Sequence, residues 1–298
     1  MVFLYERMMK IKKSDRFYNT VQGTAVAHAK PIALAHRRVC YDLNQASPAA
    51  VAAELGMSAV DLPEYCSTGI REVDIMLFNR CMSLGQNAMA TREQIETIAE
   101  WMDQHANPNW AFALGSDFHH ANIDLLLNEC GFTLRSGGIA HYWRDAVPVK
   151  HEVAPEITII EAETTQESQL FSEVVGECFQ MDRRMDARSA NLIGRKNWHC
   201  FIAHYNGEPA GTGAMMNTGE VAWLGFGGTL PQFRGKGIQQ ALLKARINKA
   251  CELDISGITI ESAYNAGEEQ PFPVSGRNIQ RLGFSLSHVS ENYSRNKT

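Results

Sequence analysis

The segment from Thr229 to Ile238 has the residue types and spacing of a phosphate-binding loop. It lies between a predicted strand and a predicted helix, where unpaired backbone N–H groups and the helix dipole both favour an anion. Gly235 and Gly237 permit positive φ and a close backbone approach, and Arg234 and Lys236 add positive charge. The segment therefore predicts a site for a pyrophosphate group.

Two common nucleotide-binding motifs do not fit this loop. A Walker A motif requires a glycine five positions before Gly235 and a Ser or Thr after Lys236, whereas the sequence has Leu230 and Gly237 there. A Rossmann fingerprint requires Gly or Ala where Gln240 stands, and it belongs in the first strand–helix turn of its domain. We therefore expect neither of these modes of phosphate binding.

The loop does match a third pattern, Q/R-x-x-G-x-G/A, through residues 232–237 (Gln-Phe-Arg-Gly-Lys-Gly). A helical segment with Ala-Leu-Leu at 241–243 follows, and residues 275–284 (Ser-Gly-Arg-Asn-Ile-Gln-Arg-Leu-Gly-Phe) look like a helix, a turn and a strand. With both motifs at this separation, residues 156–296 resemble the GNAT (general-control-related N-acetyltransferase) superfamily. A surface turn with incidental glycines is the alternative interpretation.

The resemblance implies an acetyl-CoA-dependent N-acetyltransferase, with acetyl-CoA as co-substrate and no metal. The acetyl group would pass to a primary amine of a small molecule or peptide by direct attack on the thioester. Backbone N–H groups near Thr229 and Leu230 would hold the pantetheine arm, and Asn278 would reach toward the cofactor or lie on an ordinary helix surface. The residues implied at the cofactor are Thr229, Leu230, Gln232, Phe233, Arg234, Gly235, Lys236, Gly237, Ile238, Gln239 and Asn278.

A general base and a general acid are harder to assign. Many GNAT enzymes have an acid in the strand before the loop, but residues 225–228 (Gly-Phe-Gly-Gly) contain none and the nearest is Glu220. Many also have a Tyr where this sequence has Ile279. Glu261 and Tyr264 follow a predicted strand, so their position makes them candidates for base and acid. The alternative for Glu261 is a solvated residue at the end of a strand.

The missing stock residues make a non-catalytic acyl-CoA-binding sensor or regulator a second hypothesis. Release of free CoA in the presence of amines separates it from the enzyme. A metal site at His119-His120 is not expected, because adjacent side chains on a regular element point apart and no Cys or carboxylate set accompanies them.

The predicted elements indicate a mixed α/β (α+β) fold of the GNAT type, with a central, mostly antiparallel sheet flanked by helices, in two tandem domains. The predicted helices are 44–55, 91–107, 121–130, 166–178, a long one after the loop to 253, and 277–282; the predicted strands are 72–78, 110–114, 140–143, 157–160, 200–204, 210–216, 221–227, 258–260 and one from 284. We expect an N-terminal arm or peripheral helix at 1–35, a degenerate GNAT-like domain at 36–148 and the GNAT acetyl-CoA-binding domain at 156–298. The proline-containing stretch 145–155 is the expected linker.

The N-terminal half resembles the same family more weakly. Residues 125–132 (Leu-Leu-Leu-Asn-Glu-Cys-Gly-Phe) resemble the later Gly-Phe motif, but no phosphate loop precedes them. This half is therefore expected either to wall the acceptor site or only to pack against the other domain. A fragment that begins near Pro155 is expected to keep CoA binding.

Composition narrows the remaining classes. A net charge of −5 and a pI near 6.1, without a Lys/Arg stripe, do not suggest nucleic-acid binding. No apolar run approaches the roughly 20 residues of a membrane span. The 7 cysteines are scattered without a C-x-x-C pair, which fits reduced thiols in a cytoplasmic protein. A homodimer is left open.

Overall fold

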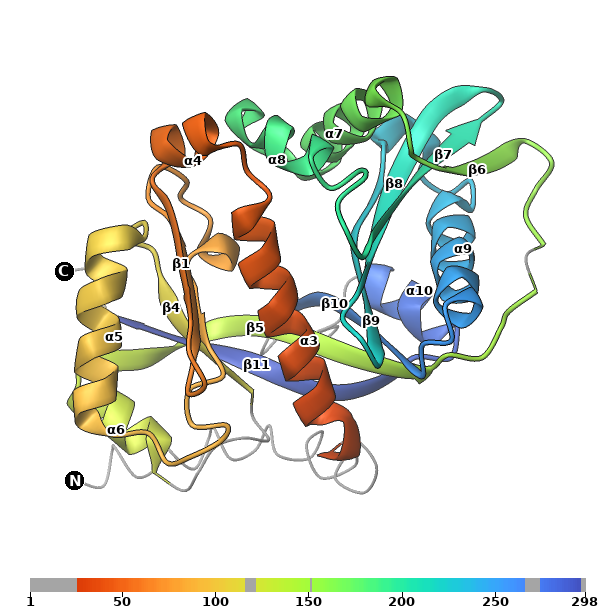
Figure 1. The fold of residues 1–298 in the computed structure, drawn as a ribbon. Coiled ribbons are helices and arrows are strands. Elements are labelled where there is room, and N and C mark those ends of the chain that lie inside the picture. Colours follow the sequence, from red (N-terminus) through yellow and green to blue (C-terminus); the bar gives the residue numbers. More distant parts are fainter. Residues whose placement is uncertain (1–25, 116–121, 151, 266–273, 296–298) are drawn as a thin grey trace.

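The computed structural model describes residues 26–115, 122–150, 152–265 and 274–295, which form a mixed α/β fold around one sheet. The sheet has 11 strands, mostly antiparallel to their neighbours, in the order β1-β2-β3-β4-β11-β5-β10-β9-β8-β7-β6. Helices pack on both of its faces (Figure 1). This confirms the expected mixed, mostly antiparallel sheet flanked by helices.

The elements follow one another in the order of the chain. The N-terminal half contains α3 (Val26–Gln45), α4 (Ala49–Leu55), β1 (Met57–Asp61), β2 (Cys66–Ile70), η2 (Met76–Phe78), β3 (Arg80–Met82), α5 (Arg92–His105), β4 (Ala111–Gly115), α6 (Ile123–Glu129) and β5 (Phe132–Asp145). The C-terminal half contains β6 (Ile157–Glu161), α7 (Thr165–Phe179), η4 (Arg183–Met185), α8 (Asp186–Ala190), β7 (Trp198–Tyr205), β8 (Glu208–Asn217), β9 (Val221–Thr229), η5 (Pro231–Phe233), α9 (Ile238–Glu252), β10 (Gly257–Tyr264), α10 (Val274–Gln280) and β11 (Ser285–Arg295).

The two halves of the chain exchange their last strands. β5 ends the N-terminal half but pairs with β10, and β11 ends the C-terminal half but pairs with β4. β5 and β11 also pair with each other, and they run across the molecule from one half to the other (Figure 1). The halves therefore share one sheet, and the boundary at 148–156 separates them along the chain but not in space.

One structural unit occurs twice. The order β3, α5, β4, α6, β5 is repeated as β9, α9, β10, α10, β11. In each unit the first two strands are parallel neighbours, which requires the crossover helix between them. The repeat agrees with the weaker family echo in the N-terminal half, while the exact domain boundaries remain predictions.

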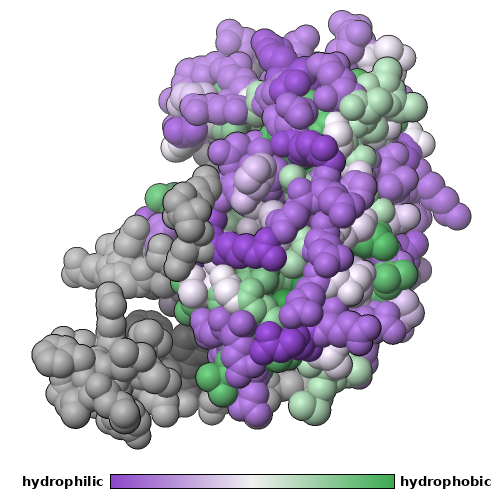
Figure 2. All heavy atoms as spheres, turned by 90° about the vertical axis from the view of Figure 1, so that its left-hand side faces the viewer, coloured by the Kyte–Doolittle hydropathy of each residue, from purple (hydrophilic) through white to green (hydrophobic). Residues whose placement is uncertain are grey.

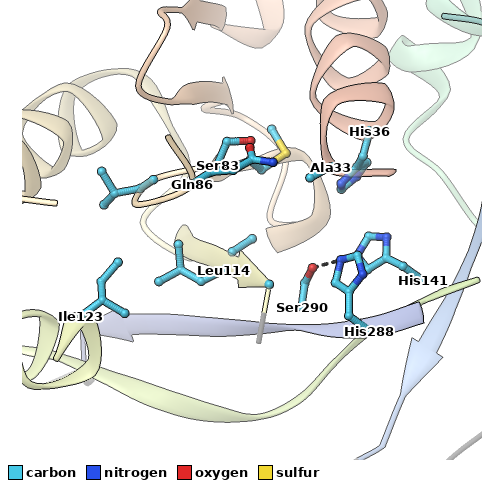
Figure 3. A pocket seen from close by; sticks show the side chains of 13 residues that line it. Ala33, His36, Ser83, Gln86, Leu114, Ile123, His141, His288 and Ser290 are labelled. Carbon is cyan, nitrogen blue, oxygen red and sulfur yellow. Dashed lines mark hydrogen bonds between the residues drawn. The ribbon is translucent and has the colours of Figure 1, made fainter. Parts of the chain in front are cut away.

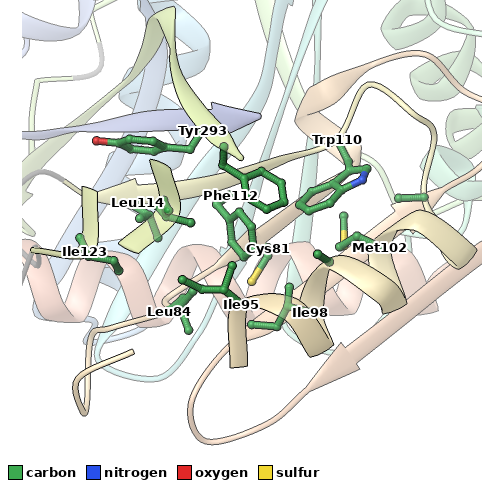
Figure 4. Packing of buried hydrophobic residues seen from close by; sticks show 14 residues of the cluster. Cys81, Leu84, Ile95, Ile98, Met102, Trp110, Phe112, Leu114, Ile123 and Tyr293 are labelled. Carbon is green, nitrogen blue, oxygen red and sulfur yellow. The ribbon is translucent and has the colours of Figure 1, made fainter. Parts of the chain in front are cut away.

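Two of the buried cores contain side chains from the exchanged strand of the other half. Phe112 of β4 and Phe132 of β5 pack edge to face at 4.9 Å between ring centroids, and Tyr293 from the end of the chain joins the same cluster (Figure 4). In the other direction, Tyr142 of β5 packs with Leu243 and its neighbours on α9. Each half thus completes its core with the last strand of the other.

Helix α3 lies at the centre of the molecule. It contacts β1, β2, β5, β9 and β11, and its residues Ala29, Ile32, Ala35 and Val39 are at most 1% exposed. Residues 26–35 are therefore neither an arm nor peripheral, which corrects that part of the expectation; residues 1–25 lie outside the described part of the chain. The buried face of α3 includes alanines, which give a weak apolar pattern, and Pro31 is typical of a helix boundary. For these two reasons the helix was not predicted from the sequence.

Asp42 connects the last turn of α3 to the C-terminal half. Its carboxylate accepts two hydrogen bonds of 2.8 Å from Arg195 and one of 2.7 Å from Trp198 Nε1. Burial opposes the charged form of Asp42, but these donors outweigh burial and hold the pKa of its carboxyl below the ordinary value. The contact fixes α3 over the sheet.

Local sequence signals account well for the regular elements. Thr91 and Thr164 both form complete capping boxes, at the starts of α5 and α7. Asn206 and Gly207 take positive φ in the hairpin between β7 and β8, as predicted. In contrast, β1 and β2 were not predicted, and 72–78 is not the expected strand: its end forms η2. β3 begins at Arg80 instead.

The outer surface is mainly polar. On the face that carries α5, hydrophilic residues cover most of the visible area (Figure 2). Among the described residues, no helix is both long and apolar enough to span a membrane.

Candidate active site

The predicted phosphate loop connects β9 to α9. Gly235 has φ +80° and Gly237, the N-cap of α9, has φ +85°. Side chains with a Cβ rarely adopt this left-handed conformation, so both glycines are needed for the turn. A Cβ at Gly235 would meet nothing within 4 Å, so backbone conformation, and not crowding within the chain, makes the requirement.

The N-terminus of α9 is free to bind an anion. The first backbone bond that closes this helix runs from Ala241 N–H to Gly237 O at 3.0 Å, so the N–H groups of residues 238–240 precede the hydrogen-bonded turns. Gly237 supplies no side-chain cap. The corresponding helix of the first unit, α5, is capped by Thr91, and Arg92 at its start is paired with Glu129. Only α9 of these two helices therefore presents an uncapped N-terminus.

Some side chains of the loop are exposed to solvent, and one packs on an aromatic ring. Gln232, Arg234 and Lys236 are exposed, so the two basic groups can follow a ligand's charge. Phe233 packs on Tyr205 at 5.9 Å between ring centroids, and Lys236 Nζ lies 5.7 Å from the same ring. Tyr205 thus anchors the loop to β7.

Asn278 lies beside the first turn of α9. Its amide Nδ2 donates to Gln239 Oε1 at 2.7 Å, and its backbone oxygen accepts from Gln240 Nε2 at 2.9 Å. The structure therefore brings together Asn278 and Gln239, which the sequence placed at the cofactor from separate motifs. Ile238 is 1% exposed, so only its backbone can contribute.

Leu230 differs from the expectation. Its N–H donates to Ala210 O at 3.0 Å, and its carbonyl accepts from Phe233 N–H at 2.9 Å. The side chain is buried. Leu230 is therefore not a free backbone donor for a pantetheine arm, because β8 already holds its N–H. Thr229 pairs in register with Gly211 at the next position, which is a non-hydrogen-bonded pair of the antiparallel ladder, so its N–H points away from β8.

Strands β9 and β10 diverge next to this loop. They pair in parallel only from Val221–Gly257 to Leu224–Ile260, although β9 continues to Thr229 and β10 to Tyr264. Phe226, with φ +51°, lies at a shift in the β8–β9 register that bends β9 there. Beyond Leu224 in β9 and Ile260 in β10, the edges of the two strands that face each other are therefore not paired.

Glu261 is the first residue of β10 beyond that pairing. Its side chain is 14% exposed, and its Oε1 accepts a 2.9 Å hydrogen bond from Trp223 Nε1 of β9. His36 Nε2 of α3 lies 3.4 Å away and His141 Nδ1 of β5 lies 3.9 Å away. The carboxylate therefore sits where both halves of the chain meet.

The histidines around Glu261 have lowered pKa values, which favours their neutral forms. Burial is the largest cause that lowers the pKa of both His36 and His141 well below the ordinary value. The charges of Arg80 and His288 act in the same direction, and for His141 only Glu261 opposes them. Burial likewise lowers the pKa of His288 to about 4.

Tyr264 lies on the opposite face of β10 from Glu261. The two residues are three positions apart on one strand, so their side chains project to opposite sides. Tyr264 packs with the cluster formed by β10, α9 and α10, whereas Glu261 faces α3. The two candidates are close along the strand but would approach a ligand from different sides.

A metal is a further ligand to consider at this cluster. His36, His141 and Glu261 place three potential ligand atoms within 4.8 Å of one another. However, the Arg80 guanidinium lies 3.3 Å from His36 Nε2 and brings a positive charge to one of these atoms. This arrangement disfavours a divalent cation. His119 and His120 lie outside the described residues.

His36 and His141 belong to no motif that would identify them from the sequence. They lie in α3 and β5, far from the phosphate loop along the chain. They are close to Glu261 because β5 pairs with β10 and because α3 packs on the sheet. Glu261 and His141 are direct partners in the β10–β5 register.

Comparison with known families bears on the second half of the chain. Residues 165–267, from α7 past β10, match the model of the acetyltransferase (GNAT) family. This region belongs to the GNAT family. Acyl transfer from acetyl-CoA is thereby implied for the GNAT region, and the uncapped helix with its two left-handed glycines fits a pyrophosphate. No curated protein matches the sequence.

Solved structures share the fold over most of the chain. A GCN5-related N-acetyltransferase from Kribbella flavida superposes with a TM-score of 0.61 at 13% identity, over 88% of this chain and 96% of that one. One from Sphaerobacter thermophilus gives 0.55 at 15% identity, over 80% and 75%. A tandem GNAT protein from the clavulanic acid biosynthesis pathway gives 0.51 at 16% identity, over 68% of each chain. At these identities the likeness concerns the fold alone, and it includes a tandem arrangement.

Proposed function

We propose that the protein transfers an acetyl group from acetyl-CoA to a primary amine of a small-molecule or peptide acceptor. The observation that carries the proposal is the position of Glu261, whose carboxylate lies at the point where β9 and β10 separate. A general base is needed there, because an ammonium acceptor must lose a proton before its nitrogen can attack a thioester.

The cofactor would be held by the α9 end of this region. The N–H groups of residues 238–240 would receive the pyrophosphate, and Arg234 and Lys236 would balance its charge from solvent. Asn278 and Gln239, already joined by a hydrogen bond, would border the cofactor on the α10 side. The unpaired edge of β9 beyond Leu224 offers backbone groups along which an extended arm can lie.

Glu261 and Tyr264 would act from the two faces of the sheet. Glu261 would take the proton of the amine on the α3 side, with Trp223 Nε1 holding one carboxylate oxygen in place. Tyr264 would give a proton to the departing sulfur on the α9 side. Their opposite orientation suits an acid and a base that serve different partners of one reaction.

An acyl-CoA sensor remains the second candidate, since Ile279 stands in place of the stock tyrosine and residues 225–228 carry no acid. The two are separated by thiol release from acetyl-CoA with and without a panel of primary amines: an amino acid, a polyamine and a short peptide. We expect amine-dependent release. Calorimetry that shows CoA binding, together with thiol release that no amine accelerates, would favour the sensor.

The role of Glu261 is tested with a matched pair of variants. E261Q is expected to lower kcat by about 10²-fold, the usual size of a general-base contribution, and to leave the CoA dissociation constant unchanged. E220Q is the control, because Glu220 is an exposed acid at the opposite end of β9 from the loop. An E261Q protein with normal kcat would remove Glu261 from the proposal.

A further inference from the structure

Ser290, His141 and Glu261 are arranged in the order of a nucleophile, a base and an orienting acid. Ser290 Oγ of β11 lies 2.7 Å from His141 Nε2. The other ring nitrogen, Nδ1, lies 3.9 Å from Glu261 Oε1 and has no hydrogen-bond partner among the described residues. In a Ser–His–carboxylate triad the serine contacts Nε2 and the acid faces Nδ1, which is the arrangement observed.

The three residues come from neighbouring strands of the shared sheet. Glu261 pairs with His141 across β10 and β5, and Ser290 follows two positions after His288, which pairs with His141 across β11. The rings of His141 and His288 stack at 4.6 Å, which restrains the His141 ring. The arrangement therefore exists only because the last strands are exchanged.

Ser290 lines a cavity together with His36 and His141, the two histidines next to Glu261. The cavity has a volume of about 30 Å³ and lies where β3 and β4 end, under α3 (Figure 3). Its described lining combines Leu84, Leu114 and Ile123 with the amide of Gln86, and neither polar atom of that amide has a hydrogen-bond partner within the described part of the chain. A volume of this size holds one or two waters, and so a group as small as an acetyl.

We propose that Ser290 is an acyl-accepting nucleophile of this protein, with His141 as its base and Glu261 as the group that orients His141. The substrate class is an ester with a small acyl group and a good leaving group. Because the triad shares Glu261 with the proposed acetyl transfer, this part of the inference rests on the proposed function, whereas Ser290 and the cavity do not.

The chemistry balances with water as the only further reactant. Ser290 Oγ bonds to the acyl carbon while its proton passes to His141 Nε2, and the departing alkoxide then takes that proton as the ester bond breaks. Water attacks the Ser290 ester by the reverse route and releases the acid. The amide Nε2 of Gln86 lines the cavity and has no hydrogen-bond partner among the described residues, so it can donate to the carbonyl oxygen that becomes negative.

Two features make His141 suited to this role. Its Nε2 lies 2.7 Å from Ser290 Oγ, where it can accept the serine proton, and burial lowers its pKa, which favours the unprotonated ring that a base requires. The groups that face it are Glu261 from β10, His36 from α3, Arg80 from β3 and His288 from β11. The 3.9 Å gap to Glu261 is longer than a hydrogen bond, and such contacts often shorten when substrate binds.

The test uses p-nitrophenyl acetate and diisopropyl fluorophosphate with the full-length protein. We expect slow p-nitrophenol release, and one phosphoryl adduct on the peptide that contains Ser290, by mass spectrometry. S290A and H141Q should each lower the rate at least tenfold, and S290A should remove the adduct. S287A is the matched control, because Ser287 is a buried neighbour on the same strand that contacts His288 at 3.1 Å.

The outcomes separate this inference from acetyl transfer. Thermal unfolding of each variant confirms that it is folded, and amine-dependent CoA release on the same preparations reports the proposed function independently. No adduct on Ser290 in the wild-type protein, or an equal ester rate in folded S290A, would overturn the inference whatever the CoA assay shows. An adduct on Ser290 that H141Q does not slow would overturn the role of His141.

Discussion

Glu261 Oε1 and His141 Nδ1 face each other at 3.9 Å across β10 and β5, although one residue belongs to each half of the chain. The contact follows from the strand exchange, which places the last strand of the N-terminal half next to the strand that carries Glu261. The N-terminal half is therefore a structural neighbour of the candidate base. It contributes side chains there without a phosphate loop of its own.

The first prediction concerns Gly237. G237V should weaken CoA binding by at least tenfold, because a β-branched residue is strained at φ +85° and would displace the N–H groups at the start of α9. G207V is the control: Gly207 has a similar φ of +84°, but it lies in the β7–β8 hairpin. Calorimetry with CoA checks both. Equal affinities in the two variants would remove the loop from the cofactor site.

The second prediction concerns charge at the loop. R234E/K236E should weaken CoA binding, and the loss should be larger at 0.02 M than at 0.5 M salt, since both side chains are exposed and charges are screened over about 10 Å at 0.1 M ionic strength. The measurement is a salt series of dissociation constants. A defect that stays the same at every salt concentration would point to a disturbed loop conformation.

The loop and its helix were predictable because their signals are local. Glycine spacing, a capping threonine or an Asn-Gly turn acts within a few residues, and these features occur where the sequence placed them. The strand exchange was not predictable in this way. Nothing within β5 specifies β10 as its partner, since pairing depends on which edges the rest of the chain leaves open.

The same distinction explains the candidate site. The loop residues and Asn278 were found from a motif, and Glu261 from its place after a strand. His36, His141 and Ser290 carry no motif, and they become neighbours of Glu261 only in the assembled sheet. The roles of the loop residues, Glu261 and Tyr264 remain predictions that the variants above test.

The third prediction concerns pH and stability. His36, His141 and His288 have lowered pKa values in the fold, so below about pH 6.5 the unfolded chain binds protons that the folded chain does not. The free energy of unfolding should therefore fall as the pH falls from 6.5, by up to about 1.4 kcal/mol per pH unit for each histidine. For His288 the loss ends near its folded pKa of about 4.

Urea unfolding at pH 7.5, 6.5 and 5.5 measures this slope. H288Q should make the slope shallower, whatever it costs at pH 7.5, because one of the buried neutral rings is gone. An H288Q protein with the wild-type slope would mean that His288 is protonated equally in the folded and unfolded states.

The fourth prediction concerns metal. Arg80 lies 3.3 Å from His36 Nε2, so His36, His141 and Glu261 should not retain a divalent cation. Dialysis against EDTA should leave amine-dependent CoA release unchanged, and metal analysis of the purified protein should show no stoichiometric zinc. Zinc that is bound in the wild type and lost in H141Q would contradict this prediction.

The last prediction concerns the independence of the halves. From the sequence, a fragment that begins near Pro155 should keep CoA binding, but in the structure such a fragment loses β5 from one edge of β10 and both β4 and β5 from β11. It also loses α3, whose Asp42 binds Arg195 and Trp198. We therefore expect residues 153–298 alone to aggregate or to unfold without cooperativity. Co-expression with residues 1–152 should restore a soluble complex that binds CoA.

Cleavage of the intact protein at a protease site inserted between residues 148 and 155 is the control, because it cuts the linker after both strands have been exchanged. The two pieces should stay together in size-exclusion chromatography. If the isolated C-terminal fragment is monomeric, unfolds cooperatively and binds CoA with full affinity, the exchanged strand β5 is dispensable for the GNAT domain.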